Sequence, residues 1–156
     1  MAKMVVGVDG SSGGVKALHW ALEEASLREA PLWIVHAWMV PLIDALPEPW
    51  VIGSPPLGPS DDEVHDHLEI AAEKVLAASV DEARSAEPEL EIRGELAEAH
   101  PASALLEAAR DADLLVVGSR GRGGFSGLLL GSVSAQCVHH APCPVVVVPA
   151  GPTRES

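Results

Sequence analysis

A glycine-rich segment from residue 118 to residue 134 has the composition of a phosphate-binding loop. Glycines allow backbone N–H groups to approach a ligand closely and to adopt positive φ angles. The segment follows an apolar run typical of a buried strand and precedes a stretch with helical character, so a helix N-terminus would add donors and a favourable dipole for an anion. Side chains that could contact a phosphate are Arg120, Arg122, Ser132 and Ser134.

The spacing in this segment excludes the two most common nucleotide-binding fingerprints. A Walker A loop requires a lysine directly after its second glycine, and the chain has no lysine beyond Lys74. The dinucleotide pattern G-x-G-x-x-G also fails, because Ser126 stands where the third glycine is needed after Gly121 and Gly123. A P-loop hydrolase and a Rossmann dehydrogenase are therefore disfavoured.

The elements that must position the segment alternate between strands and helices. Short apolar runs predict buried strands, a proline-rich stretch from 39 to 60 predicts a long loop, and helical spacing of apolar residues predicts the helices. The expected strands are 4–8, 32–38, 90–96, 114–117 and 145–148. The expected helices follow Ser11 or Ser12, run from Asp61 to about Ala83 and from Pro101 to about Arg110, and precede the last strand.

This order predicts an α/β fold, a doubly wound, mostly parallel five-stranded sheet with helices on both faces. The whole of 1–150 is expected to form one domain, with 151–156 as a C-terminal tail, because 156 residues suffice for one ordinary core. In such sheets ligands bind beyond the carboxyl ends of strands, where the strand order reverses. The first and fourth strands are the expected pair, and they end at Asp9 and Gly118.

Three fragments of the chain resemble the universal stress protein family. The ATP-binding signature of that family, Gly-x2-Gly-x9-Gly-Ser/Thr, matches Gly118, Gly121, Gly131 and Ser132 without a gap. The start, Val6-Gly-Val-Asp-Gly-Ser11, resembles the first strand of the family and its acidic turn. The end, Ala141-Pro-Cys-Pro144 followed by four valines, is similar as well. The likeness spans nearly the whole chain except the proline-rich loop.

The resemblance implies a bound adenine nucleotide, with ATP acting as a regulatory ligand and Mg²⁺ possible on its phosphates. It implies that Asp9 contacts the nucleotide, that the backbone near Ala37 reads the adenine edge, and that the glycine-rich segment holds ribose and phosphates. The site residues on this reading are Asp9, Gly10, Ser11, Ala37, Val117, Gly118, Arg120, Gly121, Gly131, Ser132, Val133 and Ser134. The chain departs from the family pattern at Gly13 and Gly14, which are expected to loosen the first helical turn.

Several other functions stay open or are disfavoured. Cyclic AMP is an alternative ligand, since some family members favour it, and a slow Mg²⁺-dependent ATPase is a second alternative. The sequence offers no catalytic constellation of nucleophile, base and charge stabilisation. Asp9 alone could be a turn or cap residue. As a phosphoryl acceptor it would need further acids after the first strand and a lysine near the last strand, which the chain lacks.

The remaining cysteines and histidines do not predict a metal site. Their spacing matches no standard zinc pattern, and packing is the favoured role of both thiols; the candidates are Cys137, His139, His140 and Cys143. His36 is expected to be partly buried near the pocket rather than to act as a base. His65 and His67 on an acidic helix are expected to be solvated.

Charge and composition bear on partners and location. The formal net charge of −13 disfavours general binding to nucleic acid, because such a field repels polyphosphate backbones. The sequence shows neither a signal peptide nor the roughly 20 apolar residues of a membrane span, and two lone cysteines suit a reducing cytoplasm. The apolar strand Val145–Val148 predicts a homodimer, because an exposed sheet edge of this kind calls for pairing. The resemblance implies pairing through the same strand.

Overall fold

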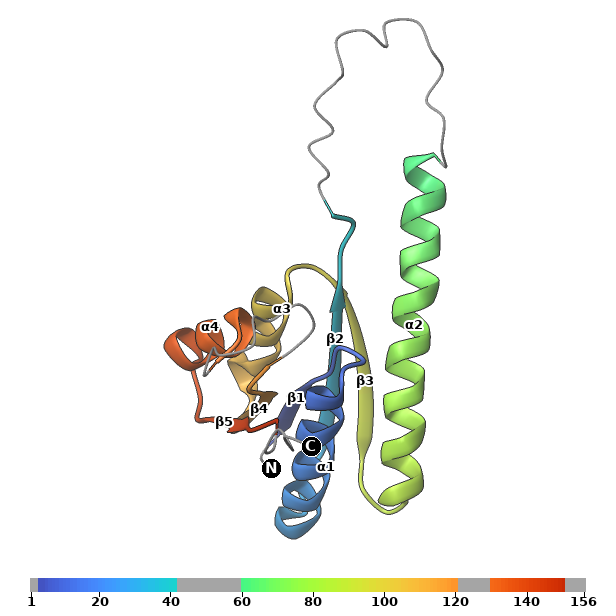
Figure 1. Cartoon of the computed structure of the whole chain (residues 1–156). Coiled ribbons are helices and arrows are strands. Elements are labelled where there is room, and N and C mark those ends of the chain that lie inside the picture. The colour runs from blue at the N-terminus through green and yellow to red at the C-terminus, as the bar shows by residue number, and fades with distance from the viewer. Residues whose placement is uncertain (1–2, 42–59, 121–129, 151–156) are drawn as a thin grey trace, which may run out of the picture.

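A computed structural model of the protein describes residues 3–41, 60–120 and 130–150, and these contain a five-stranded sheet flanked by helices (Figure 1). The strands are β1 (Met4–Gly7), β2 (Leu32–Trp38), β3 (Ile92–Glu98), β4 (Leu114–Gly118) and β5 (Val145–Val148). The helices are α1 (Ser12–Arg28), α2 (Asp61–Ala86), α3 (Pro101–Ala108) and α4 (Ser132–His140), and a 3₁₀ turn (Ala109–Asp111) follows α3.

The strand order is β3-β2-β1-β4-β5, and all four strand pairings are parallel. β1 and β4 are neighbours, with Val6 in register with Val116. The order reverses at this pair, because β2 follows β1 on one side and β4 lies on the other. The doubly wound α/β architecture and the adjacency of the first and fourth strands are therefore confirmed, and β3 and β5 lie at the two edges of the sheet.

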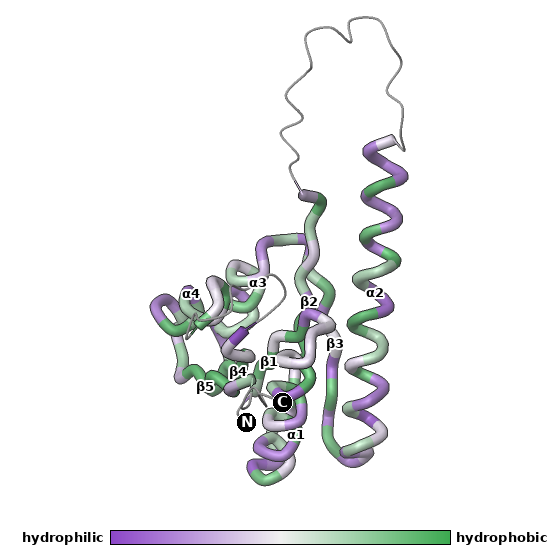
Figure 2. Tube along the Cα trace, in the orientation of Figure 1, coloured by the Kyte–Doolittle hydropathy of each residue, from purple (hydrophilic) through white to green (hydrophobic). Residues whose placement is uncertain are grey.

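The helices cover both faces of the sheet and form two apolar layers. α1 and α2 pack on one face, where Leu18 and Leu22 meet Val6, Ile34 and other strand residues. On the opposite face α3 and Cys137 of α4 pack against strand side chains of the other parity. Figure 2 shows apolar residues concentrated along β2 and β5, whereas polar and apolar residues alternate along α2. The core therefore consists of two apolar layers, one on each face of the sheet.

Element boundaries differ from the expectations by a few residues. β1 ends at Gly7 rather than Val8, β3 spans 92–98 rather than 90–96, and α2 continues to Ala86. Val15 of α1 is 39% exposed, because the buried stripe of this helix consists of glycines, alanines and leucines beside it. Most of the expected proline-rich loop, residues 42–59, lies outside the described residues.

None of the described helices combines the length and the apolar character that a membrane span requires.

The core packing of α1 generates a stability prediction. Leu18 is 1% exposed, whereas Leu27 on the same helix is 81% exposed. We expect Leu18→Ala to lower the free energy of unfolding by about 2–5 kcal/mol, because it leaves a cavity in the layer between α1 and the sheet. The matched change Leu27→Ala should stay within about 0.5 kcal/mol. Urea unfolding of the three proteins measures both values, and equal losses in the two variants would contradict the layer assignment.

Candidate functional site

A cleft of about 260 Å³ opens at the carboxyl ends of β1 and β4. Its walls come from the ends of these strands, from β2, and from the first turns of α1, α3 and α4. Most residues that the sequence singled out lie together here, namely Asp9, Ala37, Val117, Gly118, Arg120, Gly131, Ser132, Val133 and Ser134. Gly10 and Ser11 do not line the cleft, and Gly121 lies outside the described residues.

The turn between β1 and α1 holds the Asp9 carboxylate in place. Gly10 has φ of 80°, a left-handed conformation that favours glycine, so the chain turns sharply after Asp9. The backbone N–H of Ser11 donates to Asp9 Oδ1 at 2.9 Å, and the Ser11 hydroxyl donates to the same oxygen. Ser11 Oγ in turn accepts from the N–H of Gly14 at 3.2 Å and so caps α1. Gly10 and Ser11 therefore build the site without lining it.

Gly13 and Gly14 do not prevent a regular start of α1, contrary to the expectation of a loosened turn. The helix begins at Ser12, and both glycines are buried within it. A Cβ at Gly13 would lie 2.5 Å from the carbonyl oxygen of Arg120, and one at Gly14 would lie 2.9 Å from Asp9 Oδ1. Glycine has a low helix propensity, but it is needed at Gly13 and Gly14 because the helix backbone packs directly against the end of β4 and the Asp9 side chain.

The start of α4 supplies features that suit an anion. Gly131 is its N-cap residue, and no side chain caps this end, in contrast to α1 and α2. The exposed Ser132, half-buried Val133 and buried Ser134 form the first turn against the cleft. A helix N-terminus of this kind favours negative charge through its N–H groups and its dipole, and Arg120 adds a cation to the same wall.

Ser134 has a structural role that its type alone did not reveal. Its buried hydroxyl can donate to two carbonyl oxygens, that of Gly131 at 3.0 Å and that of Ser119 at 3.2 Å. The N–H of Gly131 also donates to the carbonyl of Ser119 at 2.7 Å. These bonds fix the first turn of α4 to the end of β4. Ser132 is thus the serine whose exposed side chain remains directed to solvent and the cleft.

The apolar part of the cleft lining comes partly from residues that sequence reasoning missed. Val35 and Ala37 lie on the same face of β2, so the period of two along the strand could have identified Val35. Pro101 and Leu105 come from α3 at helical spacing, and no motif in the sequence marks them. The complete set of missed lining residues is Gly7, Val8, Gly14, Val35, Pro101 and Leu105. Together with Val117 they offer a surface suited to a flat, apolar ring.

No histidine or cysteine is among the cleft-lining residues of the described chain. His36 is buried, as expected, but it does not line the cleft; its Nδ1–H donates to the carbonyl of Val8 at 2.8 Å. The segment from 137 to 143 contributes no close group of three metal-ligating atoms within the described residues. Burial raises the pKa of the Cys137 thiol to about 11, which keeps it protonated. Burial, followed by the negative charge of Asp113, also raises the pKa of Cys143.

Comparison with known proteins identifies the family. The model of the universal stress protein family matches residues 1–149. The chain belongs to this family. A universal stress protein of Mycolicibacterium smegmatis is 37% identical over 145 residues, which cover 93% of this chain and 45% of that protein. The chain spans about half the length of the curated relatives that it matches.

Solved universal stress proteins share the fold. The universal stress protein UspA from Lactobacillus plantarum has a TM-score of 0.74 at 21% identity, over 94% of this chain and 97% of that chain. A universal stress protein crystallised in complex with cAMP has a TM-score of 0.68 at 26% identity, over 96% of this chain and 98% of that chain. The sequence resemblance to universal stress proteins is thereby confirmed at the level of family and fold.

The capping role of Ser11 generates the second prediction. We expect Ser11→Ala to lower the free energy of unfolding by about 1 kcal/mol, because the variant loses the α1 cap and one donor to Asp9. Ser12→Ala is the matched control, since Ser12 is exposed and lies one residue inside the helix. Its effect should stay within about 0.5 kcal/mol. Thermal or urea unfolding measures both losses of stability. A larger loss in Ser12→Ala than in Ser11→Ala would show that Ser11 is not the residue that caps α1.

Proposed function

We propose that this universal stress protein binds an adenine nucleotide, with ATP as the first candidate, in the cleft at the carboxyl ends of β1 and β4. The observation that carries the proposal is the pairing, in one cleft, of an uncapped helix start beside Arg120 with an apolar wall from β2 and α3. The first feature suits phosphates, and the second suits a heterocyclic base. The family signature on these residues and the relative solved with cAMP support the same ligand class.

In this proposal each part of the cleft has a separate role. The first turn of α4 and Arg120 hold the phosphates, the backbone at Ala37 meets the adenine edge, and Asp9 contacts the sugar side of the nucleotide. Mg²⁺ prefers oxygen ligands and binds chiefly through phosphates. The Asp9 carboxylate and the exposed Ser132 hydroxyl are the oxygen donors of suitable type on the lining, so the residues fit such an ion.

We propose that the nucleotide in the cleft is a regulatory ligand rather than the substrate of a reaction. The Asp9 carboxylate accepts two hydrogen bonds from Ser11, which suits a positioning group better than a general base. A nucleotide-dependent switch or interaction module in the stress response is therefore our first candidate. We place it in the cytoplasm because Cys137 and Cys143 are both free thiols, as is usual in reducing compartments.

Calorimetric titration of the nucleotide-stripped protein with ATP tests the proposal. We expect Gly118→Ala to abolish binding. Gly118 does not have a positive φ angle, so we expect the loss of binding to come from crowding. A Cβ at Gly118 would lie 2.9 Å from the backbone oxygen of Gly13. Gly94→Ala is the matched control, because its Cβ meets a movable Val80 methyl at 2.8 Å, on the face of β3 that packs against α2. Native-like affinity in Gly118→Ala would contradict the site.

A second variant separates loss of the ligand contact from distortion of the cleft. Arg120→Met keeps an unbranched apolar stem but removes the guanidinium and its charge, and we expect it to weaken ATP binding about ten-fold or more. Competition with cAMP distinguishes the second ligand candidate, which the cAMP-bound relative favours. Steady release of phosphate with Mg²⁺ would instead support the slow ATPase. If the native chain binds neither nucleotide, the proposed function is wrong.

We further propose that two copies pair through β5, the edge strand Val145–Val148. All four valines are only partly buried in the single chain, and an exposed apolar edge favours pairing with another strand. We expect light scattering at micromolar protein concentration to give the mass of a dimer. A monomer mass throughout that range would contradict pairing through this strand, and it would leave the nucleotide proposal unaffected.

A further inference from the structure

The first turns of α2 have little apolar contact with the rest of the protein. The fully buried side chains of this 26-residue helix are Ala72, Val80 and Ala83, all beyond residue 71. Residues 61–71 are exposed or half-buried, and Figure 1 shows this part of α2 extending past the carboxyl ends of the strands. Segments with few buried apolar contacts open at low cost, so polar contacts must decide how firmly these turns are attached.

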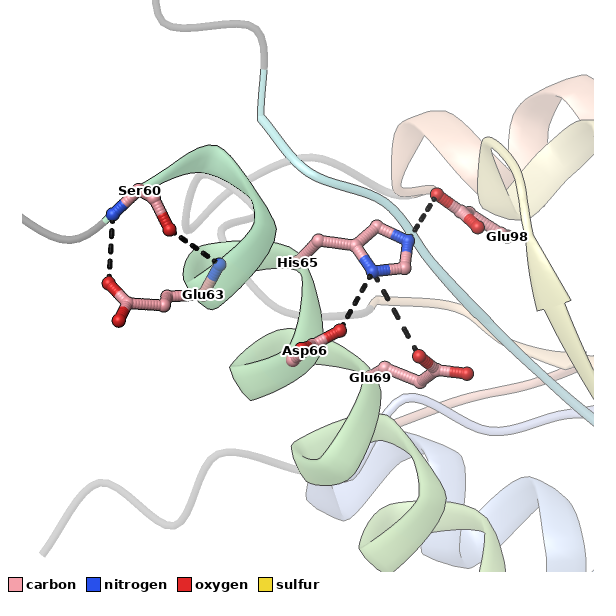
Figure 3. Close-up of polar contacts among 6 residues, drawn as sticks. All are labelled: Ser60, Glu63, His65, Asp66, Glu69 and Glu98. Atoms are coloured by element: carbon pink, nitrogen blue, oxygen red, sulfur yellow. Dashed lines mark hydrogen bonds and ion pairs between the residues drawn. The ribbon is translucent and has the colours of Figure 1, made fainter.

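A capping box supports the first turn of α2 locally, in addition to any attachment to the strands. Ser60 Oγ accepts from the N–H of Glu63 at 3.2 Å, and the Glu63 carboxylate accepts from the N–H of Ser60 at 2.9 Å (Figure 3). This capping box stabilises the helix start by itself. Short helical segments without packing fray in water, so the undocked turns would open more often, and docking adds protection to their backbone hydrogen bonds.

His65 is the polar side chain that joins these turns to the sheet. Its Nε2 lies 3.0 Å from Glu98 Oε1 at the end of β3, and its ring centroid lies 5.0 Å from that of Trp38 at the end of β2. Its Nδ1 faces Asp66 at 3.7 Å and Glu69 at 3.9 Å on α2 itself (Figure 3). His65 stays partly exposed to solvent, but it also has partners on β2 and β3 that the sequence did not predict, whereas His67 is exposed as expected.

Carboxylates surround the imidazole on both of its nitrogens. A neutral imidazole carries one N–H, so one nitrogen would direct a lone pair at carboxylate oxygens, which only accept hydrogen bonds. Among the described residues, the charged groups that face His65 are Asp66 and Glu69 from α2 and Glu98 from β3, and Trp38 from β2 has an uncharged ring. Partial burial lowers the pKa of His65, but the Glu98 hydrogen bond and the nearby carboxylates outweigh it and leave the pKa raised.

We propose that protonation of His65 docks residues 61–71 of α2 onto the carboxyl ends of β2 and β3, so that this contact is a pH-sensitive latch. The protonated ring bridges carboxylates of two elements and lies within cation–π range of Trp38. The deprotonated ring leaves Asp66, Glu69 and Glu98 with no cation between them. Because the pKa is raised in the docked state, docking is fullest below the ordinary histidine value and weakens as pH rises through the raised one.

The latch acts on strand ends that continue into the walls of the cleft. Trp38 directly follows Ala37, and Glu98 precedes Pro101 by three residues; Ala37 and Pro101 both line the cleft. The N–H of Ala99 donates to the carbonyl of Trp38 at 3.0 Å, so the two strand ends are joined. The proposal concerns docking of α2 alone and does not depend on nucleotide binding.

Hydrogen exchange of the purified chain without nucleotide tests the latch. Exchange of amides 61–71, corrected for intrinsic rates, is compared at about pH 5.5 and about pH 8, on either side of the ordinary histidine value. We expect protection to fall by about 1.4- to 5-fold at the higher pH, the range of exposed ion pairs. His65→Gln should remove this dependence, whereas His67→Gln, which alters an exposed histidine on the same turn, should retain it.

A proton NMR titration gives an independent readout of the same contact. The pKa of His65 should lie above the ordinary value in the native chain and fall in Glu98→Gln, which keeps the shape of the partner but removes its charge. A normal or lowered His65 pKa in the native chain would overturn the proposal. So would a pH dependence of exchange at 61–71 that persists in His65→Gln.

Discussion

The candidate site depends on a direct backbone contact between the first turn of α1 and the end of β4. A Cβ at Gly13 would lie 2.5 Å from the carbonyl oxygen of Arg120, and one at Gly118 would lie 2.9 Å from that of Gly13. Real Cβ atoms essentially never sit this close to backbone, so both positions need glycine for space rather than for conformation. With no side chain between them, the β1–α1 turn and the glycine-rich segment share one cleft, and Asp9 faces the same space as Arg120.

Hydrogen bonds around Ser119 extend this contact to the rest of the site. Its N–H donates to the carbonyl of Val148 at 2.8 Å, its carbonyl accepts from Gly131, and its hydroxyl accepts from the N–H of Ala150 at 3.1 Å. The two ends of the segment from 119 to 131 are thereby tied to each other and to β5. Both the strand end and the helix start that face the cleft are fixed by the protein itself, so a ligand would meet a largely preformed surface. Since β5 is also the edge strand, the same bonds connect the cleft to the surface proposed for pairing.

The sequence predicted the sheet and most of the cleft because both follow from local patterns. Apolar runs of four to seven residues identify buried parallel strands, and glycine spacing identifies where the chain turns after them. The failures lie where contacts between distant segments override local preference. Gly13 looks like a weak helix residue until the carbonyl of Arg120 is beside it, and His65 looks solvated until Glu98, 33 residues away, is placed next to it. Pro101 and Leu105 reach the cleft only because α3 packs over the ends of β1 and β2.

The distribution of charge explains how an acidic protein can offer a site for an anion. The chain carries a net charge of −13, yet Asp9 is the one acidic residue among the cleft-lining residues of the described chain, and Arg120 lines the same cleft. Exposed acids elsewhere act across water and salt, which screen them beyond about 10 Å. The helix start and Arg120 act at contact distance, where screening is small. The proposed single nucleotide would lie within this short range, whereas a polynucleotide backbone would extend over the acidic surface around it. The arrangement therefore favours a small phosphorylated ligand by restricting attraction to the cleft itself.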